Sequence, residues 1–190
     1  MFLRKSVIAA AAIGFSVAGP VAQPALAAPG APPADTNGPV RIVSDSGGQR
    51  MSIYDASSAP GAQLVADASN AWYSRKTEVW VISSDPGGYY VIKNNASGLC
   101  LQPTDPNAPA IGMNVVQQPC DGSGGQKWRL NDYSAASMDW SASKHEYMIT
   151  PSKNPNAAIA ITDWGNNNWS TVTLDHSYAA SNRLWMLYRE

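Results

Sequence analysis

The apolar residues of this chain fall in short runs that are separated by turn residues. The runs are mostly β-branched and aromatic, as in pleated sheets, and they cover residues 40–43, 79–82, 89–92, 147–150, 159–161 and 172–174. Clusters of Gly, Pro, Asn, Asp and Ser stand between them at residues 46–48, 59–61, 85–88, 105–107 and 165–168. No long segment has a helical period, and residues 56–70 are interrupted by Pro60 and Gly61. The pattern predicts an all-β chain of many short strands.

Three tryptophans return at a step of about fifty residues, which indicates an internal repeat. Trp80, Trp128 and Trp185 each close one stretch of short strands, and the three stretches run over residues 42–82, 90–130 and 147–187. A unit of a few short strands cannot bury its own apolar face, so three such units must share one core. We expect these three indoles to fill that shared core.

The N-terminus has the pattern of a secretory signal peptide over residues 1–27. Arg4 and Lys5 precede an apolar run over residues 7–18, and Ala25-Leu26-Ala27 offers small residues at a cleavage site. The run is shorter than the about 20 apolar residues that a membrane-spanning helix needs. Residues 28–39 are rich in Ala, Pro and Gly and predict a flexible lead, so we expect one secreted domain over residues 40–190 without a membrane span.

Charge and cysteine content narrow the classes of partner. Loss of Arg4 and Lys5 with the signal peptide would reduce 13 basic residues to 11, against 14 acidic ones, a formal net charge of −3. Such a mildly acidic domain is not expected to bind nucleic acid. Export favours a disulfide between Cys100 and Cys120 over free thiols, and a metal site is the weaker interpretation because no His or Cys stands at zinc-ligand spacing.

The middle unit resembles the ricin B-type lectin family. The resemblance rests on Tyr90-Val91-Ile92-Lys93-Asn94, Gly98-Leu99-Cys100-Leu101, Gly112, Val115, Cys120-Asp121-Gly122 and Gln126-Lys127-Trp128. It extends over residues 40–189, although Glu78 and Arg183 replace the Gln of the Gln-any-Trp motif in the first and third repeats. It implies a β-trefoil of three pseudo-symmetric lobes with about twelve short strands, and a structural disulfide within the second repeat.

The resemblance also implies a sugar site in each lobe. It consists of a carboxylate just after the Cys-Leu step and an aromatic ring further along the chain. The corresponding residues are Gln102 and about Gln118 in the second repeat, Tyr54 and about Asp67 in the first, and Thr162 and about Asp175 in the third. Asp55 and Asp163 stand one residue beyond the carboxylate position. No lobe keeps the family pair, so the usual galactose-type site is not expected.

Two groups of residues are candidates for a different binding site. The first is a polar pocket in the second lobe formed by Gln102, Gln117, Gln118 and Asp121, whose alternative interpretation is solvated loop residues. The second is the pair Trp164 and Trp169, which flank a polar turn. These indoles suit stacking on sugar rings and a protein contact equally well, and they would also suit covering of the core. The same ambiguity holds for Trp72, Tyr73 and Trp140.

Catalysis has little support in this sequence. The only histidines, His145 and His176, stand in no recognisable nucleophile, metal or acid–base motif, so no cofactor and no metal are expected. Paired carboxylates for glycoside hydrolysis need only be close in space, but the resemblance argues against them. The sequence therefore favours a secreted carbohydrate-binding domain with degenerate sugar sites and glycans or glycoconjugates as partners. The alternative is a non-catalytic protein-interaction trefoil, such as a toxin-type targeting subunit or an inhibitor.

Overall fold

The computed structural model describes residues 38–68, 76–133, 145–163 and 169–190. The predicted signal peptide and most of the predicted lead lie outside these residues. Pro39, the last residue assigned to the lead, already belongs to the first strand. No helix in the described part of the chain is long and apolar enough to cross a membrane.

The described residues form twelve strands and short 3-10 turns. The first lobe holds β1 (Pro39–Ser44), β2 (Arg50–Ile53), β3 (Leu64–Asp67) and β4 (Val79–Asp85); the second holds β5 (Tyr89–Asn94), β6 (Cys100–Pro103), β7 (Val115–Gln118) and β8 (Trp128–Asp132); the third holds β9 (Glu146–Pro151), β10 (Ala157–Asp163), β11 (Trp169–His176) and β12 (Leu184–Arg189). Each of the six runs predicted from the sequence lies inside one of these strands. The prediction of an all-β chain with about twelve strands is confirmed.

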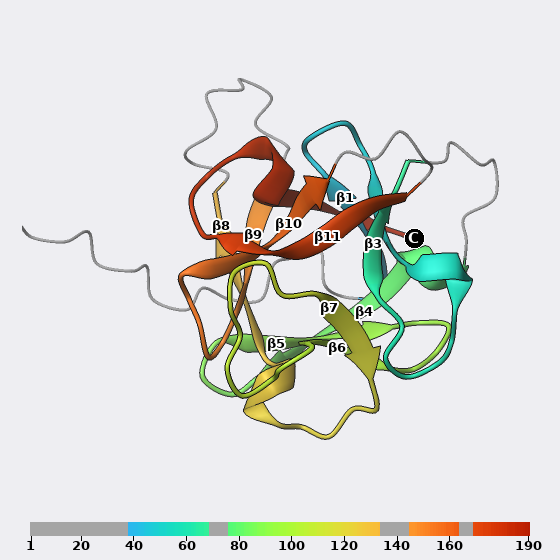
Figure 1. Ribbon diagram of the computed structural model, residues 1–190. Coiled ribbons are helices and arrows are strands. Elements are labelled where there is room, and N and C mark those ends of the chain that lie inside the picture. The colour runs from blue at the N-terminus through green and yellow to red at the C-terminus, as the bar shows by residue number, and fades with distance from the viewer. Residues whose placement is uncertain (1–37, 69–75, 134–144, 164–168) are drawn as a thin grey trace, which may run out of the picture.

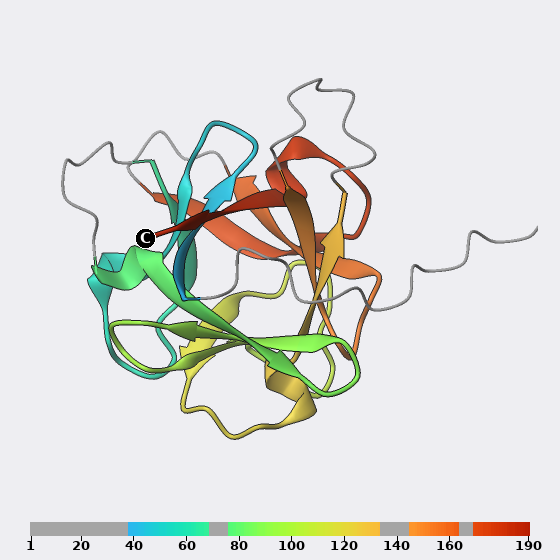
Figure 2. The ribbon, with the colours of Figure 1, turned by 180° about the vertical axis from the view of Figure 1, so that it is seen from behind.

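Six strands close a ring. β1 pairs with β4, β4 with β5, β5 with β8, β8 with β9, β9 with β12 and β12 with β1, all antiparallel. The other strands form the hairpins β2–β3, β6–β7 and β10–β11, one from each lobe. In Figures 1 and 2, β5, β6 and β7 of the second lobe lie at the bottom beside β4, and β1, β3, β10 and β11 of the other two lobes lie above them. This arrangement is the β-trefoil that the resemblance implied.

The three hairpins also join one another. β11 pairs with β3 through Thr171 and Val65, while isolated bridges join Gln63 to Val116 and Asn114 to Thr173. Each hairpin therefore contacts both of the others, and each junction brings residues of two lobes together.

The core lies inside the ring and beneath the hairpins. Trp80, Trp128 and Trp185 have no exposed surface. Each indole N–H donates to a buried backbone carbonyl, at 3.0 Å to Met51, 3.0 Å to Leu101 and 2.9 Å to Ile159. The indole thus buries its ring and satisfies its polar group at once, which is what a buried tryptophan requires. Because the three carbonyls accept equivalent bonds, they show which residues of the three lobes correspond to one another.

Candidate functional site

The correspondence of the lobes shows where the family's sugar-site positions lie. Met51, Leu101 and Ile159 accept the equivalent indole bonds, and their cross-strand partners are Ala66, Gln117 and Leu174. The next residue on each partner strand is Asp67, Gln118 and Asp175, respectively. The three residues that the sequence suggested for the aromatic position are therefore equivalent to one another in the structure. None of them is aromatic.

In the first and third lobes, the residue that corresponds to Gln102 is not the one that the sequence suggested for the carboxylate position. Counting from the same carbonyls, the equivalents of Gln102 are Ser52 and Ala160, and both are buried. Tyr54 and Thr162, which the sequence suggested, lie two residues further along the chain and correspond to Thr104 of the second lobe. The first and third lobes lack the Cys-Leu step that anchored the second. No lobe has a carboxylate at this position.

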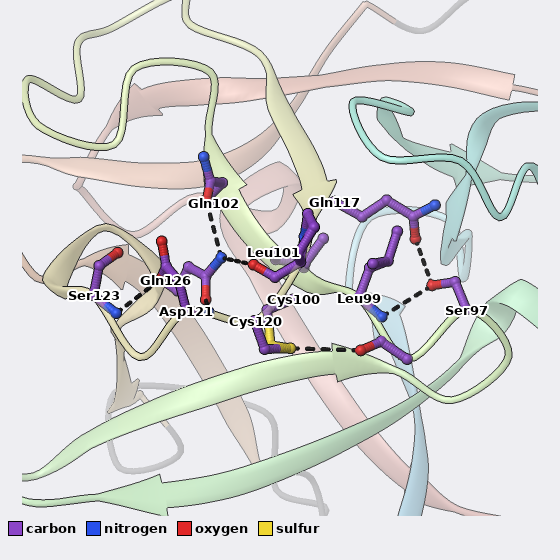
Figure 3. The surroundings of a disulfide bond; sticks show 12 residues. Ser97, Leu99, Cys100, Leu101, Gln102, Gln117, Cys120, Asp121, Ser123 and Gln126 are labelled. Atoms are coloured by element: carbon purple, nitrogen blue, oxygen red, sulfur yellow. Dashed lines mark hydrogen bonds between the residues drawn. A yellow bond between two sulfur atoms is a disulfide. The ribbon is translucent and has the colours of Figure 1, made fainter.

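In the second lobe, Gln126 of the motif uses its amide inside the protein (Figure 3). Its Nε2 donates to Gln102 Oε1 at 3.0 Å and to the Pro119 carbonyl at 2.8 Å, and its Oε1 accepts from the Asp121 backbone N–H at 2.9 Å. Gln102 is only 9% exposed. Its side-chain carbonyl oxygen therefore supports the turn η4 (Gly124–Gln126).

Gln117, another residue of the predicted polar pocket, ties two lobes together. It is fully buried, and its Nε2 donates at 3.0 Å to the backbone carbonyls of both Ser57 and Ala59 in the first lobe. Its Oε1 accepts from the Ser97 hydroxyl at 2.8 Å. All these partners are protein groups, so the structure gives Gln117 a role in holding the β2–β3 hairpin loop.

Asp121 and Gln118 lie nearer the surface of the same lobe. Asp121 is exposed, and the Ser123 backbone N–H donates to its carboxylate at 2.8 Å. This bond, followed by one from the Ser123 side chain, lowers the pKa of Asp121 from its ordinary value. Gln118 is half-buried. The neighbouring disulfide joins buried Cys100 to exposed Cys120 with the Cα atoms 5.1 Å apart, as the resemblance implied.

The surface of the second lobe is closed by tight packing around Gly125. A methyl group added to Gly125 would lie 2.2 Å from the Cβ of Pro106, closer than two carbons can approach. The loop after β6 therefore packs directly against η4. Of the predicted polar pocket, Gln102 and Gln117 are buried and bond to other protein groups, Gln118 is half-buried, and Asp121 is exposed.

The third lobe is open instead. A shallow concavity of about 420 Å³ is lined by Ile161, Thr162, Thr173, Leu174, Asp175 and Asn182 of this lobe, and by Ile111 and Gly112 of the second. Gly112 donates its N–H to the Leu174 carbonyl at 2.7 Å, which brings the loop of the second lobe to the rim. Asn182 stands at the position of Gly125, so a polar amide replaces the close packing seen in the second lobe. We call this the third-lobe concavity.

Arg183, which replaces the Gln of the motif, organises the third-lobe concavity. Its Nη2 forms an ion pair with Asp175, and its Nη1 donates to Asn182 Oδ1 at 2.8 Å. The guanidinium Cζ lies 4.1 Å from the centroid of the Tyr178 ring, a cation–π contact. Asn182 Nδ2 in turn donates to the Ile161 carbonyl at 2.8 Å. One buried side chain thus fixes two residues of the lining.

Of the residues that line or support the third-lobe concavity, the sequence named Asp175 and Thr162 as candidate site positions, but not Asn182, Ile111 or Arg183. The sequence did hold one signal for Arg183, because its charge is opposite to that of Asp175. The spatial approach of Ile111, about fifty residues away from Thr162 in the chain, left no trace in the sequence.

An aromatic pair lies where the first and third lobes meet. The rings of Tyr54 and Trp169 have centroids 4.8 Å apart and planes at 70°, an edge-to-face contact. Tyr54 is 59% exposed, and Trp169 is half-buried. The other candidate aromatic residues, Trp164, Trp72, Tyr73 and Trp140, lie outside the described residues.

Comparison with known proteins identifies the family. Residues 76–175, more than half of the chain, match the family described as ricin-type beta-trefoil lectin domain-like. The chain belongs to this ricin-type lectin family. A search of curated protein sequences found no match.

Solved structures share the ricin-type fold at low sequence identity. The designed threefold-symmetric protein ThreeFoil superposes with a TM-score of 0.65 at 19% identity, covering 81% of this chain and 100% of its own. The agglutinin of Rhizoctonia solani gives 0.65 at 15% identity, with 84% and 100% covered. The ricin B-like lectin of Macrolepiota procera, solved with lactose, gives 0.60 at 13% identity, with 82% and 97% covered. At these identities the likeness concerns the fold.

Among the residues that the structure describes, no group of three His, Cys, Asp or Glu side chains could hold a metal ion. His145 lies 3.8 Å from Asp132 at the surface, and His176 donates its backbone N–H to the Asp175 carboxylate at 2.7 Å. Within the described residues, we take two surface features built from polar or aromatic side chains as candidate binding sites. They are the third-lobe concavity and the Tyr54–Trp169 pair.

Proposed function

We propose that this ricin-type domain is a secreted, non-catalytic carbohydrate-binding protein whose main site is the third-lobe concavity. The observation that carries the proposal is the open, polar lining of that concavity at positions equivalent to closed ones in the second lobe. The family supplies the class of ligand.

The lining has the chemistry of a sugar site. The hydroxyls of Thr162 and Thr173, 3.0 Å apart, both donate and accept hydrogen bonds, and Asn182 adds an amide. The Asp175 carboxylate accepts from Arg183 and from the His176 N–H, and a carboxylate has about four acceptor sites, so it retains capacity for sugar hydroxyls. Ile111, which is 42% exposed, offers an apolar surface for the C–H groups of a pyranose.

The site differs from that of a typical family member, which supports the view that the sugar sites are degenerate. Ser52, Gln102 and Ala160 provide no carboxylate at the family position, and the aromatic position of the third lobe is Asp175. A shallow site of this kind binds a single glycan weakly and gains strength from several copies. Secretion is supported by the N-terminal pattern and by the disulfide, which persists in an oxidising compartment.

A glycan array tests the proposal with a matched pair of variants. The protein from residue 28 onward is compared with Thr162→Val and with Thr104→Val, which removes the same hydroxyl at the equivalent, closed position of the second lobe. Both threonines are exposed, so neither variant is expected to unfold. Circular dichroism checks the fold of each.

We expect selective binding by the wild type, weaker binding by Thr162→Val and unchanged binding by Thr104→Val. Binding that Thr162→Val and a further Asp175→Asn variant leave unchanged would reject the third-lobe concavity as the site. Absence of binding to every glycan by the folded wild type would reject the carbohydrate proposal and favour the protein-interaction alternative.

A further inference from the structure

We propose that two copies of this chain pair face to face through the outer face of the barrel that β12, β1, β4 and β5 form. This face contains none of the sugar-site positions of the three lobes, and it shares no residue with the third-lobe concavity. The inference therefore goes beyond the proposed function and does not depend on it. Figure 2 shows β4 and β5 as green strands on the side turned to the viewer.

The side chains on this outer face are largely apolar although they point away from the core. In β4, Trp80 and Ile82 are buried, while Val81 between them is half-buried and faces outward, as alternation along a strand requires. The cross-strand registers extend the same face over four strands. Its apolar members, which we call the β4 wall, are Pro39, Val79, Val81, Val91 and Tyr188. Contiguous apolar surface of this kind marks a site of protein contact.

The equivalent surface of the second lobe is polar and bonded within the protein. The positions before and after the motif tryptophan carry Val79 and Val81 in the first lobe, and Lys127 and Arg129 in the second. The Lys127 ammonium lies 2.6 Å from a carboxylate oxygen, and the Arg129 guanidinium donates to a tyrosine hydroxyl at 3.1 Å. The trefoil therefore accepts charged residues at these positions, and the valines leave apolar surface that a partner would cover.

One row of residues runs across the β4 wall and carries opposite charges at its two ends. Pro39 stands opposite Val81, and Val81 stands opposite Lys93. The backbone N–H of Glu190 donates to the Pro39 carbonyl at 3.1 Å, so Glu190 continues the row on the far side of β1. The row thus consists of an acid, two apolar residues and a base, and both charged residues are exposed.

This row is complementary to itself, which points to a second copy of the chain as the occupant. A twofold axis that lies in the interface along the strands, between Pro39 and Val81, turns the row end for end. It places Lys93 of each copy opposite Glu190 of the other, as an isologous contact requires. Within the described part of the chain, no carboxylate pairs with Lys93. Glu190 pairs with Arg41, but a carboxylate has about four acceptor sites and can accept from Lys93 as well.

Pairing through the β4 wall brings two third-lobe concavities into one particle. It uses none of the residues that line them. Two weak sites that are held together bind a surface with many copies of a ligand more tightly than either site alone.

Sedimentation equilibrium of the protein from residue 28 onward, at concentrations up to about 1 mM, measures the mass of the particle. We expect the wild type to reach the mass of two copies. Val81→Arg copies Arg129 of the second lobe and places like charges near the axis, while Lys93→Glu sets two acids opposite each other. Each should raise the dissociation constant about tenfold or more. The control Lys153→Glu makes the same charge change at an exposed residue outside the β4 wall and should have no effect.

A carbodiimide, which joins an amine to a neighbouring carboxylate, tests the orientation of the two copies. The wild type should give a covalent dimer in which peptide mass analysis finds Lys93 joined to Glu190. Lys93→Arg keeps the charge but has no amine, so it should sediment as a dimer and lose this cross-link.

Three results would overturn the inference. They are a wild type that stays monomeric over the whole concentration range, a dimer that the folded Val81→Arg and Lys93→Glu variants leave intact, and a covalent dimer joined only at other residues. Circular dichroism checks the fold of each variant. The glycan array fails separately from these measurements. A dimer that binds no glycan rejects the proposed function alone, and a monomer that loses glycan binding in Thr162→Val rejects this inference alone.

Discussion

Replacement of Arg183 by Gln would restore the family residue in the third lobe, yet the structure predicts that it destabilises the protein. Arg183 is 6% exposed and pairs with Asp175, whose side chain is 23% exposed. Removal of one member of a buried ion pair costs about 3–5 kcal/mol because the other charge stays buried. Partial access of water to Asp175 reduces this cost, so we expect Arg183→Gln to lower the free energy of unfolding by about 2–3 kcal/mol.

The second substitution Asp175→Gln tests the reasoning. Together the two changes reproduce Gln118 and Gln126, the residues that the second lobe carries at these positions. Because the double variant leaves no buried charge, we expect it to cost only about 1 kcal/mol, less than Arg183→Gln alone. The coupling energy between the two residues should therefore exceed about 1.5 kcal/mol.

Equilibrium unfolding in urea, followed by tryptophan fluorescence, measures all four proteins of the cycle. Lys153→Gln serves as the control because Lys153 is exposed and bonds only to the surface residue Asn107, at 2.9 Å. It should change the free energy of unfolding by less than about 0.5 kcal/mol. Additivity of Arg183→Gln and Asp175→Gln within about 0.5 kcal/mol would show that the two side chains do not stabilise each other, and the assignment of Arg183 would fail.

Four further predictions concern other parts of the structure. Gln117→Leu should lower the free energy of unfolding by about 1–3 kcal/mol, because the Ser57 and Ala59 carbonyls and the Ser97 hydroxyl lose their hydrogen bonds to the buried Gln117 amide; an unchanged urea midpoint would contradict this. Reduction of the disulfide between Cys100 and Cys120 should cost about 3 kcal/mol, measured by unfolding with and without a reducing agent. Ala56→Gly should raise stability by about 0.5–1 kcal/mol, as glycine adopts the φ of 49° without strain; a lower melting temperature would refute the left-handed turn. Because hydrogen bonds from Ser123 lower the pKa of Asp121 in the folded protein, the carboxylate stabilises the protein above the ordinary pKa of an aspartate, and this stabilisation is lost as the pH falls through the folded pKa; the stability difference between wild type and Asp121→Asn should therefore vanish in acid.

The fold was predictable because its determinants are local and repeated. Trp128 with Gln126 identified the motif, and the recurrence of Trp80 and Trp185 gave the number of lobes. The short β-branched runs gave half of the strands directly. β7 escaped because two of its four residues are glutamines, and one of them, Gln117, bonds to another lobe.

The candidate site was predictable only in part, since it depends on contacts between lobes. The residues that the sequence suggested for the aromatic position, Asp67, Gln118 and Asp175, are equivalent to one another because strand pairing preserves the spacing to the tryptophan. The carboxylate position shifted by two residues in the first and third lobes, where no cysteine marks the strand. Neither the closure of the second lobe by Pro106 nor the approach of Ile111 to Thr162 follows from one-dimensional spacing.

The residue at the Gln position of the motif shows how the three lobes differ on a shared core. Gln126 is neutral and donates to carbonyl groups. Glu78, 1% exposed, lies 3.2 Å from Arg50, and Arg183 pairs with Asp175. Each charged replacement has acquired an opposite charge, as a buried charge without a partner is too costly to keep.

Because each buried charge has a partner of opposite charge, the surface of a lobe can change while the fold stays stable. The indole bonds to Met51, Leu101 and Ile159 are the same in every lobe, while the surface above them is closed in one lobe, aromatic at the boundary of another and open in the third. A residue that supports the surface, such as Arg183, can therefore change together with its partner without disturbing the tryptophan beside it. Binding specificity in this trefoil is accordingly expected to reside in the pairs that surround the motif, and not in the motif itself.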